Sequence, residues 1–161
     1  TGTGGKTMES LVEDGLVAGV LDITTTEWAD ELVGGTLTAG PTRLEAAGKA
    51  GVPAIVTPGC LDMANFGERD STTPEECAEL GKILAEKVNA YTAPVTVLLP
   101  TKAISIISAE GQPFCDPEAD AALFSTIKEN LSDSVELIEV DAAINDPEFS
   151  KACAEALLEK L

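Results

Sequence analysis

The chain has 161 residues, which is enough for one domain with a hydrophobic core and too few for two comfortable ones. Its 44% hydrophobic and 24% charged residues are ordinary for a globular protein, and its net charge of −18 disfavours a broad surface for nucleic acid or anionic lipid. The apolar runs are far shorter than the roughly 20 residues that cross a bilayer. We therefore expect no membrane partner, no nucleic-acid partner because of the charge, and, because the cysteines are few, a cytoplasmic protein.

The side chains available for chemistry are limited, because the sequence contains no histidine. This removes the commonest general base and any Ser-His or Cys-His pairing within these residues. The four cysteines, Cys60, Cys77, Cys115 and Cys153, include no C-x-x-C pair. We therefore predict reduced thiols and no metal site.

The first half of the chain alternates short apolar runs with amphipathic stretches, as parallel α/β proteins do. The glycines before residue 6 predict a turn that leads into a helix. Thr26 is a plausible N-cap for a later helix. In chain order, we predict a helix over 5–15, a strand over 16–24, helices over 26–33 and 40–51, and a strand over 52–59 that Pro58 interrupts.

The second half gives clearer helix signals, because threonine or aspartate stands directly before proline three times, at Thr73, Asp116 and Asp146. Each is a predicted N-cap with proline in the first turn. We predict, in chain order, a helix over 72–90, a strand over 93–101, a helix over 116–131, a strand over 134–142 and a helix over 146–161. The whole pattern predicts a single α/β domain over 1–161, with a Rossmann-like parallel sheet and helices on both faces in three layers.

Ligands of such sheets bind outside the carboxyl ends of the strands, so residues that follow the strands are the candidates. The glycines also have a structural explanation as turns, and N-capping or bonding to the backbone explains one or two of the threonines. The loop that contains Asp62 and Asn65 has little structural reason to be so specific. The predicted ligand-binding residues are Gly2, Thr3, Gly4, Gly5, Thr24, Thr25, Thr26, Glu27, Gly34, Gly35, Gly59, Asp62 and Asn65. If the protein is an enzyme, the candidate acid–base groups are Asp62, Glu27 and Lys102.

Gly5-Lys6-Thr7 ends like a phosphate-binding P-loop, but the pattern requires a glycine five positions before Gly5 and a strand leading into it. Neither falls within these residues. We therefore interpret Gly-Lys-Thr as a coincidence on a different glycine turn, which still offers backbone N–H groups to an anion.

Long motifs carry a more specific resemblance. "TGTGGKTMESLVEDGLVAGVLDITTTEWADELVGGTLTAGPTRLEAAGKAGVPAIVTPGCLDMANFG" (1–67), "PVTVLLPTKAISIISAEGQPFCDPEADAALF" (94–124) and "VDAAINDPEF" (140–149) follow one another. Together they resemble the C-terminal half of the uncharacterised, ATP-binding-domain-like family that includes the tomato mosaic virus resistance protein.

The resemblance implies that the chain is half of a two-domain protein that forms homodimers and binds ATP or a similar nucleotide. The implied partners are a small-molecule ligand, the N-terminal domain of the same protein and a second copy. Compared with the family, segments are expected to be missing before residue 1 and near 70–72, and Cys115 stands where the family usually has histidine.

Three functions remain open at this point. The domain could bind a small ligand such as ATP or a phosphorylated metabolite. It could be an enzyme acting on a small carbonyl or phosphorylated compound through carboxylates. It could also be a protein-interaction or inhibitor module, as the plant member of the family implies.

Overall fold

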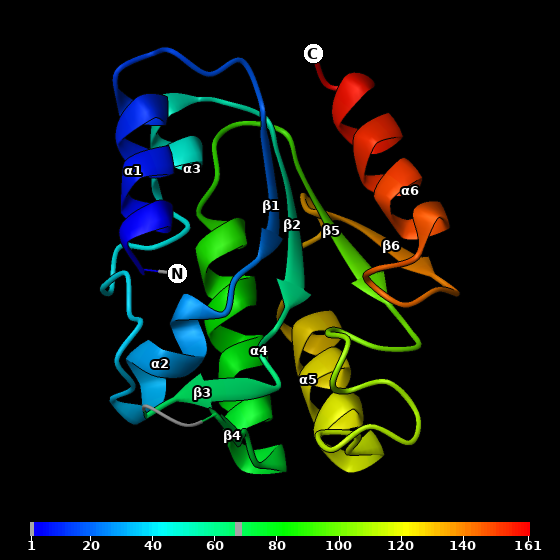
Figure 1. Cartoon of the computed structure of the whole chain (residues 1–161). Helices are drawn as coiled ribbons and strands as arrows, with labels where there is room; N and C mark the ends of the chain where they lie inside the picture. Colours follow the sequence, from blue (N-terminus) through cyan, green and yellow to red (C-terminus); the bar gives the residue numbers. More distant parts are fainter. Residues whose placement is uncertain (1, 67–68) are drawn as a thin grey trace.

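A computed structural model describes residues 2–66 and 69–161. Thr1 and Gly67, which begin and end the first quoted motif, lie outside this part of the chain. Four parallel strands form the central sheet (Figure 1): β1 (Val20–Thr24), β2 (Ala54–Gly59), β5 (Val95–Pro100) and β6 (Glu136–Val140). Their order is β1-β2-β5-β6, so each strand lies next to the one before it in this list. The predicted Rossmann-like parallel sheet is confirmed.

Helices cover both faces of the sheet, but unevenly. The larger hydrophobic core contains side chains of α1 (Gly2–Glu13), α2 (Glu27–Val33), α3 (Ala46–Ala50), α4 (Pro74–Asn89) and α5 (Pro117–Asn130). The smaller core, on the other face, contains side chains of α6 (Pro147–Leu158). All residues of β2 and β5 are buried, as expected for central strands with helices on both faces. The three-layer architecture is therefore also confirmed.

The predicted N-caps differ in what their side chains do. Thr73 forms a full capping box with Glu76, and Asp116 accepts hydrogen bonds from the amides of Glu118 and Ala119. Thr26 and Asp146 occupy the N-cap positions of their helices without a side-chain capping bond. Asp146 instead accepts from the amide of Ala143 at 2.8 Å, which ties the end of the β6 loop to α6.

The structure corrects three predicted elements. The first helix begins at Gly2, so the glycines predicted as a turn lie inside α1. The helix predicted over 40–51 is only the short α3, because Gly40 and Leu44 have positive φ angles of 87° and 75°, which break a helix. Pro58 does not end the second strand, which runs on to Gly59, but the pairing with β1 shifts register there, between the pair Asp22 and Val56 and the pair Thr24 and Gly59.

A two-stranded antiparallel hairpin was not predicted. It consists of β3 (Met63–Asn65) and β4 (Arg69–Ser71) and follows the carboxyl end of β2. Asp30 on α2 accepts from the amide of Asn65 at 2.8 Å and from its side-chain nitrogen at 2.9 Å. This distant contact, rather than a local pattern, fixes the hairpin against α2.

Candidate functional site

The carboxyl ends of β1 and β2 are locked to each other by the residues that follow them. The hydroxyl of Thr57 donates to the carbonyl of Ile23 at 2.5 Å, and the hydroxyl of Thr25 donates to the carbonyl of Thr57 at 3.0 Å. Gly59 lies so close to β1 that an added Cβ would overlap the carbonyl oxygen of Ile23. Thr25, Thr57 and Gly59 thus hold two strands together at the edge where a ligand was expected.

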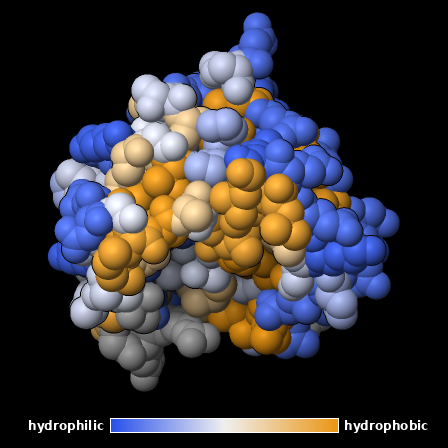
Figure 2. Space-filling model, turned by 90° about the horizontal axis from the view of Figure 1, so that it is seen from above, coloured by the Kyte–Doolittle hydropathy of each residue, from blue (hydrophilic) through white to orange (hydrophobic). Residues whose placement is uncertain are grey.

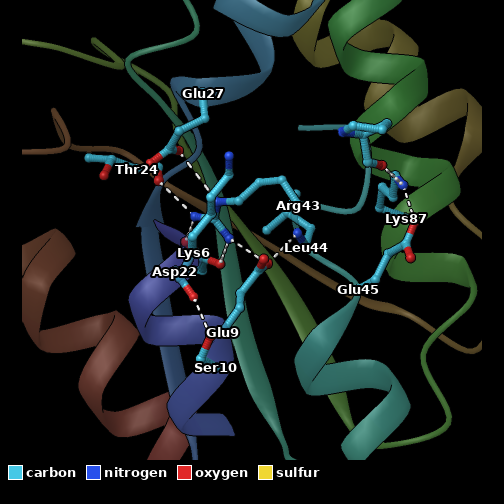
Figure 3. Close-up of polar contacts among 11 residues, drawn as sticks. Lys6, Glu9, Ser10, Asp22, Thr24, Glu27, Arg43, Leu44, Glu45 and Lys87 are labelled. Atoms are coloured by element: carbon cyan, nitrogen blue, oxygen red, sulfur yellow. Dashed lines mark hydrogen bonds and ion pairs between the residues drawn. The ribbon is translucent and has the colours of Figure 1, made fainter. Parts of the chain in front are cut away.

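Arg43 is the centre of a buried ionic cluster (Figure 3), and its side chain is only 3% exposed. It makes two hydrogen bonds to the carboxylate of Asp22 on β1, one of them 2.6 Å long. Its Nη1 lies 3.3 Å from Glu9 on α1, and its Nε lies 3.4 Å from Glu27 at the start of α2. One guanidinium therefore joins α1, β1, α2 and the loop before α3.

Among the described residues, three carboxylates, those of Glu9, Asp22 and Glu27, lie against the one guanidinium of Arg43. Burial raises the pKa of Glu9, although the Leu44 amide and Arg43 act in the opposite direction. Burial also raises the pKa of Asp22 against the effect of its Arg43 bonds. Burial by itself would lower the pKa of Arg43. The hydrogen bonds and the charge of Asp22 have the opposite effect, and the net result is a raised pKa, so the guanidinium stays charged.

A second polar group connects Asp30, Asn65 and the segment after α2. Besides the two bonds from Asn65, Asp30 lies against Gly35, where an added Cβ would overlap its carboxylate. The amide and hydroxyl of Thr36 both donate to the carbonyl of Asn65, at 2.8 Å and 3.0 Å. Gly34 ends α2 with a φ of 80°. Asn65 and the two glycines are thus used in joining α2 to the hairpin.

Asp62 lies in a third setting, in the loops after β2 and β5. It is buried, and its Oδ2 accepts a hydrogen bond of 2.7 Å from the hydroxyl of Ser105. The hydroxyl of Ser108 accepts from the amides of Ile104 and Ser105. The amide of Cys60, which has a φ of 60°, donates to the carbonyl of Ile104 at 2.9 Å. These bonds fix the loop that follows β5 against the end of β2.

Two hollows flank this loop at the carboxyl edge of the sheet. The Cys60 hollow has a volume of about 210 Å³ and is lined by residues that follow β2, β5 and β6, among them Cys60, Met63, Ser105 and Asn145. The Lys102 hollow has a volume of about 480 Å³ and lies between the β5 loop and the first turns of α5. Its polar lining consists of Thr101, Lys102, Ser108, Glu110, Cys115 and Asp120.

The Lys102 hollow contains a cation and an unusual carboxyl group. The side chain of Lys102 is 57% exposed and its Nζ donates to the carbonyl of Asp141 at 3.0 Å. Burial, followed by the charges of Asp62 and Asp116, raises the pKa of Asp120 to about 6. The lining of the hollow therefore includes an accessible ammonium group and a carboxyl group that can exchange protons near neutral pH.

The predicted site residues do not all lie around one hollow. The predicted acid–base groups have different surroundings: Glu27 is beside Arg43, Asp62 is beside Ser105, and Lys102 is beside Asp141. Gly2 and Gly5 pack against Thr38 and Arg43, and Thr25, Gly35, Gly59 and Asn65 have the structural contacts given above. Thr3, Gly4, Thr24 and Gly34 are exposed, and Thr26 is half-buried.

Sequence reasoning missed Arg43 and the α5 side of the larger hollow. Arg43 is one of two arginines in a very acidic chain, and this rarity was the available signal for a buried ionic role. Asp120 follows the Asp116 cap by one helical turn, which places both carboxylates at the same end of α5. Glu110 and Cys115 lie in an irregular loop whose course no local pattern reveals.

Within residues 2–66 and 69–161, no group of three or more His, Cys, Asp or Glu side chains is placed to hold a metal ion. None of the helices in this part of the chain has the length and apolar character required to span a bilayer.

By its fold, the chain is a three-layer parallel α/β domain with hollows at the carboxyl ends of its strands. The family model of the C-terminal domain of uncharacterised protein family UPF0261 matches it over residues 1–72 and 70–161. The chain therefore belongs to the UPF0261 family, as its motifs indicated.

Relatives in bacteria and plants are similar over nearly the whole chain. The UPF0261 protein of Clostridium tetani is 44% identical, over 98% of this chain and 45% of the relative. UPF0261 protein RA0729 of Rhizobium meliloti is 40% identical, over 97% of this chain and 45% of the relative. The ToMV resistance protein Tm-1(GCR237) of tomato is 36% identical, over 99% of this chain and 24% of the relative. The chain thus spans less than half the length of these relatives.

Proposed function

We propose that this domain binds a small ligand in the Lys102 hollow, as part of a longer two-domain protein that forms homodimers. The observation that carries the proposal is a hollow of about 480 Å³ at the carboxyl edge of a parallel sheet, lined by Lys102 and Asp120. Small-molecule sites commonly have volumes of about 300–1,000 Å³, and this edge is where parallel sheets bind their ligands.

The lining of the hollow restricts the chemistry of the ligand. Lys102 favours an anionic group, whereas Glu110 and Asp120 favour hydroxyl or ammonium groups. We propose a phosphorylated metabolite or a nucleotide such as ATP, with one phosphate at Lys102 and sugar hydroxyls at the carboxylates. Because the protein carries a net charge of −18, a triphosphate would need Mg²⁺ or basic groups of another domain to offset repulsion.

The first test is calorimetric titration of Mg-ATP, and separately of a sugar phosphate, into the full-length protein. Lys102→Ala should weaken the binding of the phosphorylated ligand about tenfold, because a charge-assisted hydrogen bond is lost. Lys151→Ala is the matched control, since Lys151 is an exposed lysine on α6. The Lys151→Ala variant should bind the phosphorylated ligand with the same affinity as the unaltered protein.

Alkylation gives a second readout at the same hollow. Cys115 is exposed and lines the hollow, whereas burial raises the pKa of Cys77 and of Cys153 to about 11, which leaves little thiolate. A bound ligand should slow alkylation of Cys115. Binding that leaves both this rate and the affinity of Lys102→Ala unchanged would place the ligand elsewhere.

Asp120 supports a second candidate function, an enzyme that acts on a small carbonyl or phosphorylated compound. Its pKa of about 6 suits a general base at neutral pH, and it lies in the same hollow as Lys102. Any turnover should rise as pH increases through about 6, where Asp120 loses its proton. Asp120→Asn should abolish this inflection, whereas Asp133→Asn, at an exposed turn, should preserve it.

An interaction or inhibitor role has weaker support. The tomato proteins named for ToMV resistance and for ToMV susceptibility are both 36% identical to this chain. Similarity in this domain therefore does not distinguish a protein named for resistance from one named for susceptibility.

A further inference from the structure

The outer edge of β1 carries a backbone that is ready to pair. β1 ends the described sheet, with β2 on its inner side. The amide of Val20 donates toward β2, to the carbonyl of Pro53 at 2.9 Å. Because successive residues of a strand point their N–H and C=O groups to opposite sides, the N–H and C=O of Leu21 face the outer edge. An open edge of this kind is a template for a further strand.

Exposed leucines surround this edge. Leu11 on α1, Leu16 in the connection to β1 and Leu21 on β1 are 43%, 71% and 44% exposed. Leu161 is 65% exposed, and a Cβ added at Gly19, just before β1, would lie 2.9 Å from its side chain. Figure 2 shows a broad apolar area on the end of the molecule where the strands begin. In so acidic a protein, grouped exposed leucines indicate a surface that another segment covers.

The topology specifies which segment fits. From β1 to β2, β5 and β6, each step moves in one direction across the sheet, and the helices between the strands pack in the core of one face. This is what right-handed crossovers require. α1 packs on that same face through Met8 and Val12 and then leads into β1. A parallel strand leading into α1 must, with the same handedness, lie beside β1 on the side away from β2.

The position of α1 agrees with this arrangement. In Figure 1, α1 lies on the outer side of β1, and its amino end points toward the carboxyl edge of the sheet. A strand parallel to β1 ends at that edge, so a short turn would connect it to Gly2. The relatives supply the length required: more than half of the Clostridium tetani protein lies outside the matched region, and the matched family model is a C-terminal domain.

We propose that the outer edge of β1 binds a parallel β-strand from the polypeptide that precedes α1 in the complete protein. The strand receives backbone hydrogen bonds at Leu21 and covers Leu21 with apolar side chains. The added strand then becomes the edge strand of the sheet, next to β1 and on the side away from β2. It comes from the same polypeptide, so no second molecule is needed to cover the edge of β1.

Hydrogen exchange in the full-length protein tests this pairing. The Leu21 amide should exchange at least about 100-fold more slowly than its intrinsic rate, as paired amides do. The Glu139 amide is the matched reference: Val140 faces β5 through its bond from the amide of Thr101, so Glu139 faces the open side of β6. Exchange of Leu21 within about tenfold of its intrinsic rate would overturn the proposal.

Proline substitution gives an independent measurement, because proline is tolerated at an open edge but not inside a ladder. Leu21→Pro should lower the midpoint of thermal unfolding of the full-length protein strongly, and Glu139→Pro should lower it little. Equal effects at the two edges would contradict the proposal. Protection of Leu21 that disappears on dilution, together with dissociation of a dimer in light scattering, would also overturn it, because a second copy would then occupy the edge.

Discussion

Replacing Arg43 with methionine is expected to lower the free energy of unfolding by about 3–5 kcal/mol at pH 7, because it leaves buried carboxylates without their cation. The side chains of Arg43, Asp22 and Glu27 are 3%, 8% and 4% exposed, so water cannot replace the guanidinium. Methionine retains much of the apolar volume, so the loss reports charge rather than a cavity. Urea unfolding at equilibrium measures it.

The loss should depend on pH with a definite sign. Burial raises the pKa of Glu9 and of Asp22, so the folded state holds their protons at higher pH than the unfolded chain does. When the pKa of a carboxyl group is higher in the folded protein than in the unfolded chain, its contribution to stability is fully present below the pKa of the unfolded state. This contribution is lost as the pH rises through the pKa of the folded state. Without Arg43, the pKa of Glu9 and the pKa of Asp22 should both rise further, because Arg43 lowers them. The difference between Arg43→Met and the unaltered protein should therefore shrink as pH falls from 7 toward about 4.

Two further variants separate the cluster from general effects of lost charge. Lys49→Met removes a cation that is 70% exposed on the neighbouring α3, and its unfolding midpoint should not change. Asp22→Asn combined with Arg43→Met should recover part of the lost stability, because one buried charge is removed with its partner. A deficit below about 1 kcal/mol for Arg43→Met alone would mean that the carboxylates do not depend on Arg43.

The parts of the fold that could be predicted are those with local signals. The run from Val95 to Leu99 is apolar except for Thr96 and is buried on both faces, so its length and composition identify a central strand. Thr73 and Asp116 cap their helices with side-chain hydrogen bonds, and the proline and first-turn carboxylates that follow each of them mark these helix starts in the sequence. These contacts lie within a few residues of each other in the sequence.

The candidate site was less predictable because its contacts join distant residues. Arg43 meets Asp22 and Glu9 across 21 and 34 residues, and Asp62 meets Ser105 across 43. At the ends of β1 and β2, the hydroxyls of Thr25 and Thr57 and the carbonyl of Gly59 form hydrogen bonds with the backbone of the neighbouring strand. The hairpin of β3 and β4 was missed for the same reason, since its strands have three residues each and depend on Asp30.

Replacing Gly59 with alanine is expected to lower the free energy of unfolding by about 3 kcal/mol, the upper part of the range for overpacking. The added Cβ would overlap the carbonyl oxygen of Ile23 and come within 2.6 Å of Ile144 Cδ1. Relief requires the ends of β1 and β2 to separate, which breaks the bond from the Thr25 amide to the Gly59 carbonyl, now 3.0 Å long. Urea unfolding again gives the value.

The matched control is Gly4→Ala, because Gly4 was predicted in the same set of ligand-binding glycines but has nothing within 4 Å of an added Cβ. Gly4 lies inside α1, so alanine should raise the free energy of unfolding by about 0.5–1 kcal/mol through its better helix propensity. Opposite signs at the two glycines would show that Gly59 serves the close approach of two strands. A Gly59→Ala protein of unchanged stability that loses ligand affinity would instead assign Gly59 to the binding site.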